Sequence, residues 1–126
     1  MSDVLSVGII GAGLSGMVAA RRIADAGFPV TVYEKSRGVG GRMATRRADD
    51  NTSFDHGAQY FTVRDDVFRQ HVESWLNNGL VAAWPNRAAG QRFVVLEQGN
   101  PDSESNSVDR FVALPAMNSI CKYLAA

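Results

Sequence analysis

A glycine-rich turn at residues 11–16 stands between a predicted strand and a predicted helix. The preceding residues 4–10 are rich in β-branched side chains, which predicts a strand buried on both faces of a parallel sheet. Apolar residues then recur every three or four positions over residues 14–26, which predicts a helix ending at Gly27. Residues 30–33 form the next predicted strand. This order predicts a βαβ unit and therefore the α/β fold class.

The glycines of this turn have distinct steric roles in phosphate binding. Gly11 allows the sharp turn, Gly13 lets a pyrophosphate approach the backbone, and Gly16 lets the helix pack closely on the strand. The N-terminus of the helix points N–H groups and a partial positive charge at the phosphates. Glu34, at the end of the second strand, is placed to accept hydrogen bonds from a ribose diol and to repel the 2′-phosphate of NADP. NAD and FAD both remain open from this motif alone.

A second glycine-rich stretch, residues 35–42, follows Glu34 and ends in Gly40-Gly41-Arg42. Here the sequence resembles the FAD-dependent amine oxidase superfamily, which includes monoamine oxidases and carotenoid desaturases. The resemblance implies that Gly40 and Gly41 let the backbone pass close to FAD, and that Arg42 contacts FAD near its pyrophosphate. An arginine fork matches phosphate geometry.

Within that superfamily the chain is most similar to renalase-like proteins. The similarity rests on residues 41–43, on Asp55-His56-Gly57-Ala58-Gln59-Tyr60-Phe61-Thr62, and on residues 110–117. It implies that residues 57–59 line the isoalloxazine ring of the flavin, with Tyr60 and Phe61 packed nearby.

The predicted cofactor-binding residues come from the two glycine motifs, from the end of the second strand and from the flavin-side segment. They are Gly11, Ala12, Gly13, Leu14, Ser15, Gly16, Glu34, Lys35, Gly41, Arg42, Met43, Gly57, Ala58, Gln59 and Tyr60. No catalytic residue is assigned. His56 is either a proton shuttle or a loop histidine, Trp84 lines a substrate pocket or braces a sheet edge, and Cys121 is a buried thiol or a site of covalent flavin attachment.

The rest of the chain predicts a mixed extension of helices and strands. Residues 35–47 are expected to be mostly loop with a short helical turn near Gly40, and residues 54–62 a loop leading into a strand. Asp65 is the predicted N-cap of a helix that ends at Gly79. The later elements are strands at 81–84, 92–97 and 110–114, a flexible hairpin tip at 98–109, and a helix that begins at Pro115.

Two domains follow from this pattern. Residues 1–62 are predicted to be a Rossmann-like FAD-binding βαβ unit with its flavin-contacting loop. Residues 63–126 are predicted to begin a substrate domain and return to the FAD domain. The resemblance implies the N-terminal portion of a larger two-domain flavoprotein.

Composition excludes several classes of function. The formal net charge is zero, which does not favour nucleic acid or an acidic membrane as a partner. One cysteine and two histidines allow no intrachain disulfide and no metal-ligand cluster, so no metal is expected and a cytoplasmic, reducing location fits. No stretch reaches the ~20 apolar residues of a membrane span.

The favoured function is that of an FAD-dependent oxidoreductase. The resemblance implies a small-molecule substrate, an amine or a dihydronicotinamide-type compound, that gives a hydride to the flavin, with O2 as acceptor. Two alternatives remain: an NAD-dependent dehydrogenase that uses the same turn, and a non-catalytic dinucleotide-binding fragment. The sequence leaves the oligomeric state open.

Overall fold

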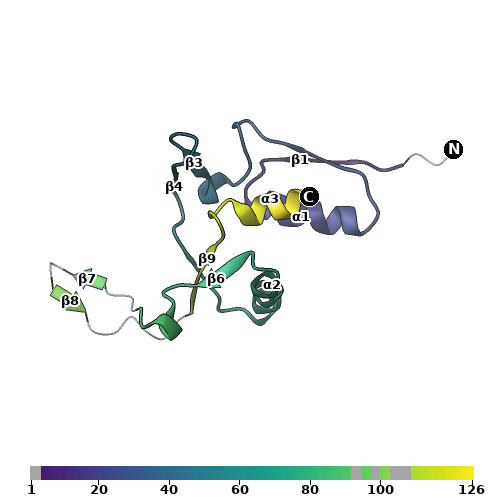
Figure 1. Ribbon diagram of the computed structural model, residues 1–126. Coiled ribbons are helices and arrows are strands. Elements are labelled where there is room, and N and C mark those ends of the chain that lie inside the picture. Colours follow the sequence, from purple (N-terminus) through teal and green to yellow (C-terminus); the bar gives the residue numbers. More distant parts are fainter. Residues whose placement is uncertain (1–3, 92–94, 98–99, 103–108) are drawn as a thin grey trace. The chain divides into compact units, whose positions relative to one another are not determined.

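The computed structural model describes residues 4–91, 95–97, 100–102 and 109–126 (Figure 1). The chain divides into two compact units. Unit 1 combines Met1–Gln59 with Ala116–Ala126, and unit 2 is Tyr60–Pro115. The glycine motifs, Glu34 and the segment at residues 57–59 all belong to unit 1.

Unit 1 is built on the predicted βαβ arrangement. Strand β1 (Val7–Ile10) and strand β2 (Val30–Tyr33) pair in parallel, and helix α1 (Leu14–Asp25) connects them. Met17 and Ala20 are the buried residues of α1. Helix α3 (Ser119–Ala125) lies against α1, which brings the last residues of the chain beside the first motif (Figure 1). The predicted α/β class and βαβ unit are confirmed.

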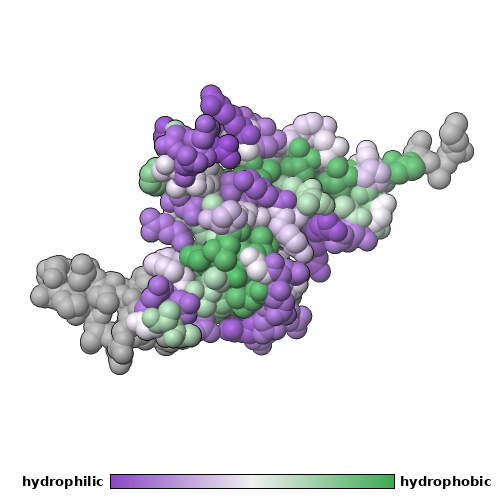
Figure 2. All heavy atoms as spheres, viewed as in Figure 1, coloured by the Kyte–Doolittle hydropathy of each residue, from purple (hydrophilic) through white to green (hydrophobic). Residues whose placement is uncertain are grey.

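The prediction that the first strand is buried on both faces is wrong. Burial alternates along both strands, so that one face is half-buried and the other is exposed. Ile10 is 93% and Tyr33 is 62% exposed. The side chains of a strand alternate between its faces, and only the face toward α1 is covered within the described part of the chain. Figure 2 shows hydrophobic residues at the surface of the part of unit 1 that Figure 1 labels β1.

The loop predicted at residues 35–47 is more structured than expected. A 3₁₀ turn, η1 (Gly41–Met43), confirms the helical turn near Gly40. Strand β3 (Thr45–Arg47) follows and pairs with strand β4 (Ser53–Asp55) as an antiparallel hairpin, which corrects the loop prediction there. The hydroxyl of Thr45 donates to Oδ1 of Asp55 at 2.6 Å across this pair. Cross-strand side-chain pairs of this kind contribute to the stability of a strand pair.

Unit 2 contains a three-stranded antiparallel sheet and one long helix. The strand order is β5 (Phe61–Thr62), β9 (Arg110–Ala113) and β6 (Val81–Ala83). Helix α2 (Asp66–Asn77) buries Val72 and Trp75. Its predicted N-cap is confirmed, since Oδ1 of Asp65 accepts a hydrogen bond from the N–H of Phe68 at 2.9 Å. A second 3₁₀ turn, η2 (Arg87–Ala89), follows β6.

The predicted strand at 92–97 and hairpin tip at 98–109 are described only in part. Strand β7 (Val95–Glu97) pairs with strand β8 (Asn100–Asp102), so residues 100–102 are strand rather than loop. Residues 92–94, 98–99 and 103–108 lie outside the described residues.

The last helix begins later than predicted. It starts at Ser119 rather than at Pro115; the chain bends at residues 115–116 and forms a turn at residues 117–118. The hydroxyl of Ser119 accepts a hydrogen bond from the N–H of Ala116 at 3.3 Å, so a side chain of the helix stabilises the turn before it. Met117, Ile120 and Cys121 in this part of the chain are at most 1% exposed, so one side of the turn and helix is buried. No helix in the described part of the chain has the length and hydropathy that a membrane crossing requires.

Candidate functional site

The first glycine turn requires glycine at Gly11 and at Gly16 for two different reasons. Gly11 has a φ of 98°, and its N–H donates to the carbonyl oxygen of Tyr33 at 2.8 Å. A Cβ atom at Gly16 would collide with the carbonyl oxygen of Gly11. The turn therefore depends on glycine for its backbone angles at one end and for close packing at the other.

The two glycine motifs form one interlocked structure. The N–H of Gly40 donates to the carbonyl oxygen of Ala12 at 2.9 Å, and residues 13 and 40 form an isolated parallel bridge. A Cβ atom at Gly41 would lie 3.1 Å from the Cα atom of Gly13. The paired glycines thus bring the second turn into backbone contact with the first. The sequence placed both motifs near a cofactor, but nothing in their spacing predicted this direct contact.

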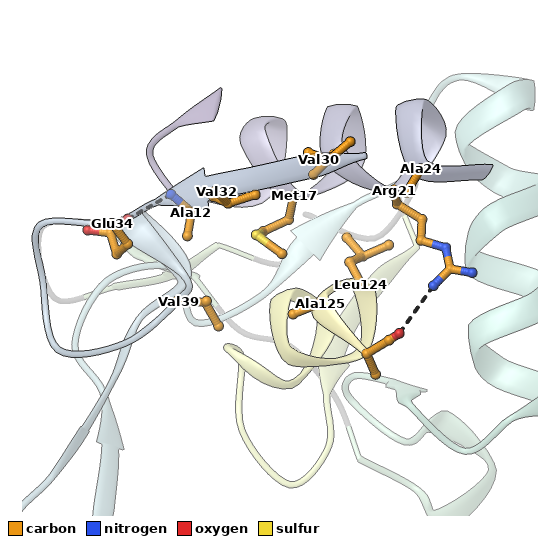
Figure 3. Close-up of a pocket in the computed structure, with 12 residues that line it drawn as sticks. Ala12, Met17, Arg21, Ala24, Val30, Val32, Glu34, Val39, Leu124 and Ala125 are labelled. Atoms are coloured by element: carbon orange, nitrogen blue, oxygen red, sulfur yellow. Dashed lines mark hydrogen bonds between the residues drawn. The ribbon is translucent and has the colours of Figure 1, made fainter. Parts of the chain in front are cut away.

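Glu34 holds the first turn through its carboxylate. Its Oε2 accepts from the N–H of Ala12 at 2.7 Å (Figure 3). Its Oε1 accepts from the N–H of Ser36 at 2.8 Å. These bonds, first from Ser36 and then from Ala12, lower the pKa of Glu34 to about 2. Hydrogen bonding to the charged form explains the direction of the shift. The carboxylate is ionised at neutral pH, and each oxygen retains a further lone pair for a ligand hydroxyl.

The backbone of Ala12 is therefore held by hydrogen bonds on both sides of its Cα atom. Its N–H is bound by Glu34, and the carbonyl group of the same residue is bound by the second glycine motif. Ala12 itself is only 1% exposed and packs with Met17 and Cys121 in a buried cluster. Burial raises the pKa of the Cys121 thiol. A neutral, enclosed thiol favours the reading of Cys121 as a core residue over its use as an attachment site.

Helix α1 presents its N-terminus without a protein cap. Its N-cap residue is Gly13, no side chain bonds to the first turn, and that turn contains no acidic residue. Leu14, Ser15 and Gly16 supply the N–H groups of the first turn, which have no acceptor within the helix. With the partial positive charge of the helix, these groups suit an anionic ligand such as a phosphate. The donor set fits the pyrophosphate of a dinucleotide.

A cavity of about 410 Å³ runs from this turn toward the end of α3 (Figure 3). Ala12, Glu34 and Val39 line one end of it. The remaining wall is mostly apolar and comes from α1, β2 and α3. At the far end, the guanidinium of Arg21 donates to the carbonyl oxygen of Ala126 at 3.3 Å.

The predicted flavin-side segment lies against the second glycine motif. The N–H of Ala58 donates to the carbonyl oxygen of Arg42 at 2.8 Å. A Cβ atom at Gly57 would collide with the same oxygen. Glycine is therefore required for the approach of these two backbones, and the structure brings together Gly57, Ala58 and Arg42.

The other predicted site residues differ in exposure. Lys35, Arg42 and Gln59 are exposed, whereas Met43 is 8% exposed and belongs to the core. Tyr60 belongs to unit 2. The roles of all these residues toward a cofactor stay predictions.

Tyr60 is part of an aromatic arrangement within unit 2. Its ring stacks on Trp84 at a centroid distance of 5.6 Å, and the guanidinium of Arg110 lies 5.6 Å from the Tyr60 ring centroid. A cavity of about 220 Å³ is lined by Trp84, Arg110 and their neighbours. Trp84 thus both borders a cavity and adjoins the end of β6, so both readings of this residue are compatible with its position.

Sequence reasoning missed two parts of the site. One is the backbone N–H of Ser36 that binds Glu34. The other is Asp55, which accepts hydrogen bonds from Thr45 and from the N–H of Met117, 62 residues further along the chain. No spacing rule predicts either contact. The Asp55-His56-Gly57 sequence carried a signal only as part of the family resemblance.

Comparisons with known proteins agree with this site. The family model of an NAD(P)-binding Rossmann-like domain matches residues 9–75, slightly more than half of the chain. The 4,4'-diapophytoene desaturases (4,4'-diaponeurosporene-forming) of Staphylococcus aureus strains Newman and USA300 are 43% identical over 67 residues, which cover 51% of this chain and 13% of each relative.

Solved structures give a similar result. Wild-type putrescine oxidase bound to putrescine aligns with a TM-score of 0.50 and 25% identity, covering 80% of this chain and 21% of that one. A double mutant from a redesign of cofactor binding in the same enzyme aligns with a TM-score of 0.50 and 26% identity over the same shares. This chain therefore spans 13% and 21% of the lengths of the relatives named here.

A desaturase and an amine-oxidising enzyme are relatives of the kind that the sequence predicted. The resemblance to the FAD-dependent amine oxidase superfamily is confirmed at this level. These relatives do not distinguish a renalase-like member from the others. Because the family model covers more than half of the chain, including the first glycine turn, β2 and Glu34, the chain belongs to the NAD(P)-binding Rossmann-like domain family.

Proposed function

We propose that this chain binds the adenosine-diphosphate part of FAD and serves an FAD-dependent oxidoreductase of the amine oxidase type. The observation that carries the proposal is the interlocking of two glycine motifs around the ionised carboxylate of Glu34. A single glycine turn fits any dinucleotide. The second turn, held in backbone contact with the first, extends the same surface toward Arg42 and residues 57–59.

The charge of Glu34 supports FAD or NAD over NADP. A carboxylate with a pKa of about 2 is charged at any neutral pH, so it repels a 2′-phosphate and accepts hydrogen bonds from an unmodified ribose. The second glycine motif and the two kinds of relative support FAD over NAD. Cofactor binding in putrescine oxidase has been redesigned, which is consistent with a cofactor site in that enzyme.

Each predicted site residue has a role in this proposal. The first turn of α1 and Arg42 bind the pyrophosphate, Glu34 accepts from the ribose hydroxyls, and Lys35 adds positive charge nearby. Residues 57–59 and Tyr60 adjoin the flavin end. FAD, when bound, would supply the electron-accepting chemistry, and the residues of this chain bind and orient it.

The finer functional assignment is also part of the proposal. The similarity at residues 55–62 and 110–117 supports a renalase-like protein that oxidises an amine or a dihydronicotinamide-type compound, with O2 as the acceptor and a cytoplasmic location. Anaerobic mixing of the flavin-loaded protein with both classes of compound, followed by absorbance, tests the substrate. Bleaching with neither class of compound would exclude this finer assignment.

The coverage of the relatives favours one alternative. This chain spans 13% of the desaturases and 21% of putrescine oxidase, so a dinucleotide-binding module without activity of its own is the second candidate. In that case the chain binds FAD, and no compound of either class reduces it.

The experiment that tests the main proposal is a titration of the purified 126-residue chain with FAD, NAD and NADP, followed by flavin fluorescence quenching and by competition. We expect FAD to bind most tightly and the purified protein to show the visible absorption bands of oxidised flavin. A colourless protein that binds NAD in preference to FAD would identify an NAD-dependent dehydrogenase. A protein that binds none of the three would exclude the proposal.

A further inference from the structure

A polar cluster in unit 1 lies outside the predicted cofactor-binding residues. Its centre is Asp55, the last residue of β4. Oδ1 of Asp55 accepts the hydroxyl proton of Thr45 at 2.6 Å. The N–H of Met117 donates to both carboxylate oxygens, at 3.1 Å to Oδ1 and 3.2 Å to Oδ2. The hydroxyl oxygen of Thr45 in turn accepts from the N–H of Asn118 at 3.4 Å.

This cluster joins two parts of the chain that are far apart in sequence. Thr45 and Asp55 belong to the β3–β4 hairpin, whereas residues 117 and 118 form the turn that leads into α3. The carboxylate is half-buried, and hydrogen bonds to an ionised acceptor are stronger than those between neutral groups. Removing the carboxylate would leave the Met117 N–H, within a fully buried residue, without this acceptor.

The position of Asp55 in the chain connects the cluster to the predicted flavin side. Gly57 is two residues further on, in backbone contact with the carbonyl group of Arg42, and the N–H of Ala58 donates to that carbonyl. Asp55 anchors one end of this short segment, and Arg42 anchors the middle. The position of residues 57–59 is therefore set by both anchors together.

We propose that Asp55 is a positioning residue that holds residues 57–59 in place for the flavin end of FAD, through its hydrogen bonds to Thr45 and Met117. This inference rests on the proposed function, because it assumes that these residues adjoin the flavin. Asp55 has no contact with the glycine turn at residues 11–16 among the hydrogen bonds of the described residues. Its effect is accordingly separable from that of Glu34.

Because Asp55 and Glu34 act on different parts of the proposed site, the inference can be tested by comparing two ligands. ADP carries the adenosine and pyrophosphate groups without the flavin, so it reports on the glycine turns alone. We expect Asp55→Ala to weaken FAD binding about tenfold, ~1.4 kcal/mol, and to leave the affinity for ADP unchanged. Asp55→Asn retains one acceptor oxygen and should lose less FAD affinity than Asp55→Ala. The absorption bands of the bound flavin should shift in Asp55→Ala relative to the wild-type chain.

Two further variants complete the design. Asp49→Ala removes a carboxylate from the tip of the same hairpin, where it accepts local hydrogen bonds from Asn51 and Thr52, and should change neither affinity. Thr45→Val removes one partner of Asp55 while conserving side-chain shape, and should produce the same selective loss of FAD affinity. It provides the test if Asp55→Ala does not fold.

The outcomes distinguish the inference from the function on which it rests. Equal losses of FAD and ADP affinity in Asp55→Ala and Thr45→Val would show that the cluster supports the fold only, and would overturn the inference. Unchanged affinity for both ligands in these variants would overturn it as well, while leaving the proposed function intact. Failure of the wild-type chain to bind either ligand would reject the proposed function, and the role of Asp55 with it.

Discussion

Glu34 holds the first glycine turn in place and is also the predicted acceptor for the ribose of the cofactor. Its position after the second strand predicts a ribose acceptor, and the structure adds that the same carboxylate holds the N–H groups of Ala12 and Ser36. A substitution of Glu34 is therefore expected to alter the conformation of the turn as well as the binding of the ligand. Glu34→Gln removes the charge but keeps one acceptor oxygen, whereas Glu34→Ala removes both, so the two variants separate the effect of charge from that of hydrogen bonding.

The acid dependence of stability should identify Glu34 as a hydrogen-bonded carboxylate. Its pKa in the folded chain is about 2, against 4.5 for the unperturbed group, so the carboxylate stabilises the fold above about pH 4.5 and this contribution is lost as the pH falls toward 2. Urea unfolding of the wild type and Glu34→Gln, measured over this range, should give curves that differ most at neutral pH and converge in acid. A difference that is independent of pH would contradict the assigned pKa shift.

Glycine at position 16 should be indispensable, in contrast to glycine at position 38. A methyl group at position 16 collides with the carbonyl oxygen of Gly11, whereas a Cβ atom at position 38 has nothing within 4 Å. Gly16→Ala should lower the free energy of unfolding by about 2–4 kcal/mol and abolish FAD binding. Gly38→Ala is the matched control and should be neutral in chemical denaturation and in ligand titration. Equal effects of the two substitutions would contradict the close packing.

At the scale of elements, the sequence predicted those helices and strands that are determined locally, by residue type or by apolar periodicity. The glycine turn and the apolar periodicity predicted β1, α1 and β2, and Asp65 predicted the start of α2. The β3–β4 hairpin was missed because the Thr45–Asp55 bond, which forms only on pairing, outweighs the loop-like composition of residues 35–53. The start of α3 was misplaced because Ser119 supports a turn that its position in the sequence does not reveal.

In the candidate site, too, the sequence predicted the local features and missed the contacts between distant segments. Both glycine motifs and Glu34 were identified from sequence, since their roles depend on residue type and spacing. The contact of Gly40 with Ala12 and the bonds of Asp55 to Met117 were not, because they join segments through tertiary packing. Long-range contacts of this kind leave no periodic signal in a single sequence.

The cap of α2 offers a quantitative test of an element that the sequence did predict. Asp65→Ala removes the acceptor of the Phe68 N–H and should cost about 1 kcal/mol of unfolding free energy. Asp65→Asn keeps an oxygen that is a good N-cap acceptor and should restore most of that loss. The measurement is equilibrium denaturation followed by circular dichroism. Indistinguishable stabilities of the Ala and Asn variants would show that the cap contributes little.

At the scale of the whole molecule, the last residues of the chain pack against its first helix. Residues 116–126 complete unit 1 after the excursion through unit 2, and α3 packs on the same helix whose N-terminus faces the proposed phosphate site. Cys121 of α3 shares a buried cluster with Ala12 of the glycine turn. Cofactor binding at one end of the sequence should therefore stabilise the other end.

Hydrogen exchange should detect this coupling. With FAD at about 100 times its dissociation constant, linkage stabilises the binding-competent unit by up to about 2.7 kcal/mol. Backbone amides of Ser119–Ala125 should then exchange more slowly, together with those of the glycine turns, although α3 lies more than a hundred residues from the first motif. The Glu34→Ala chain at the same FAD concentration is the control and should show less added protection in α3, because it binds FAD more weakly. Protection confined to the glycine turns would mean that α3 opens independently of the βαβ unit, and that unit 1 does not unfold as one cooperative structure.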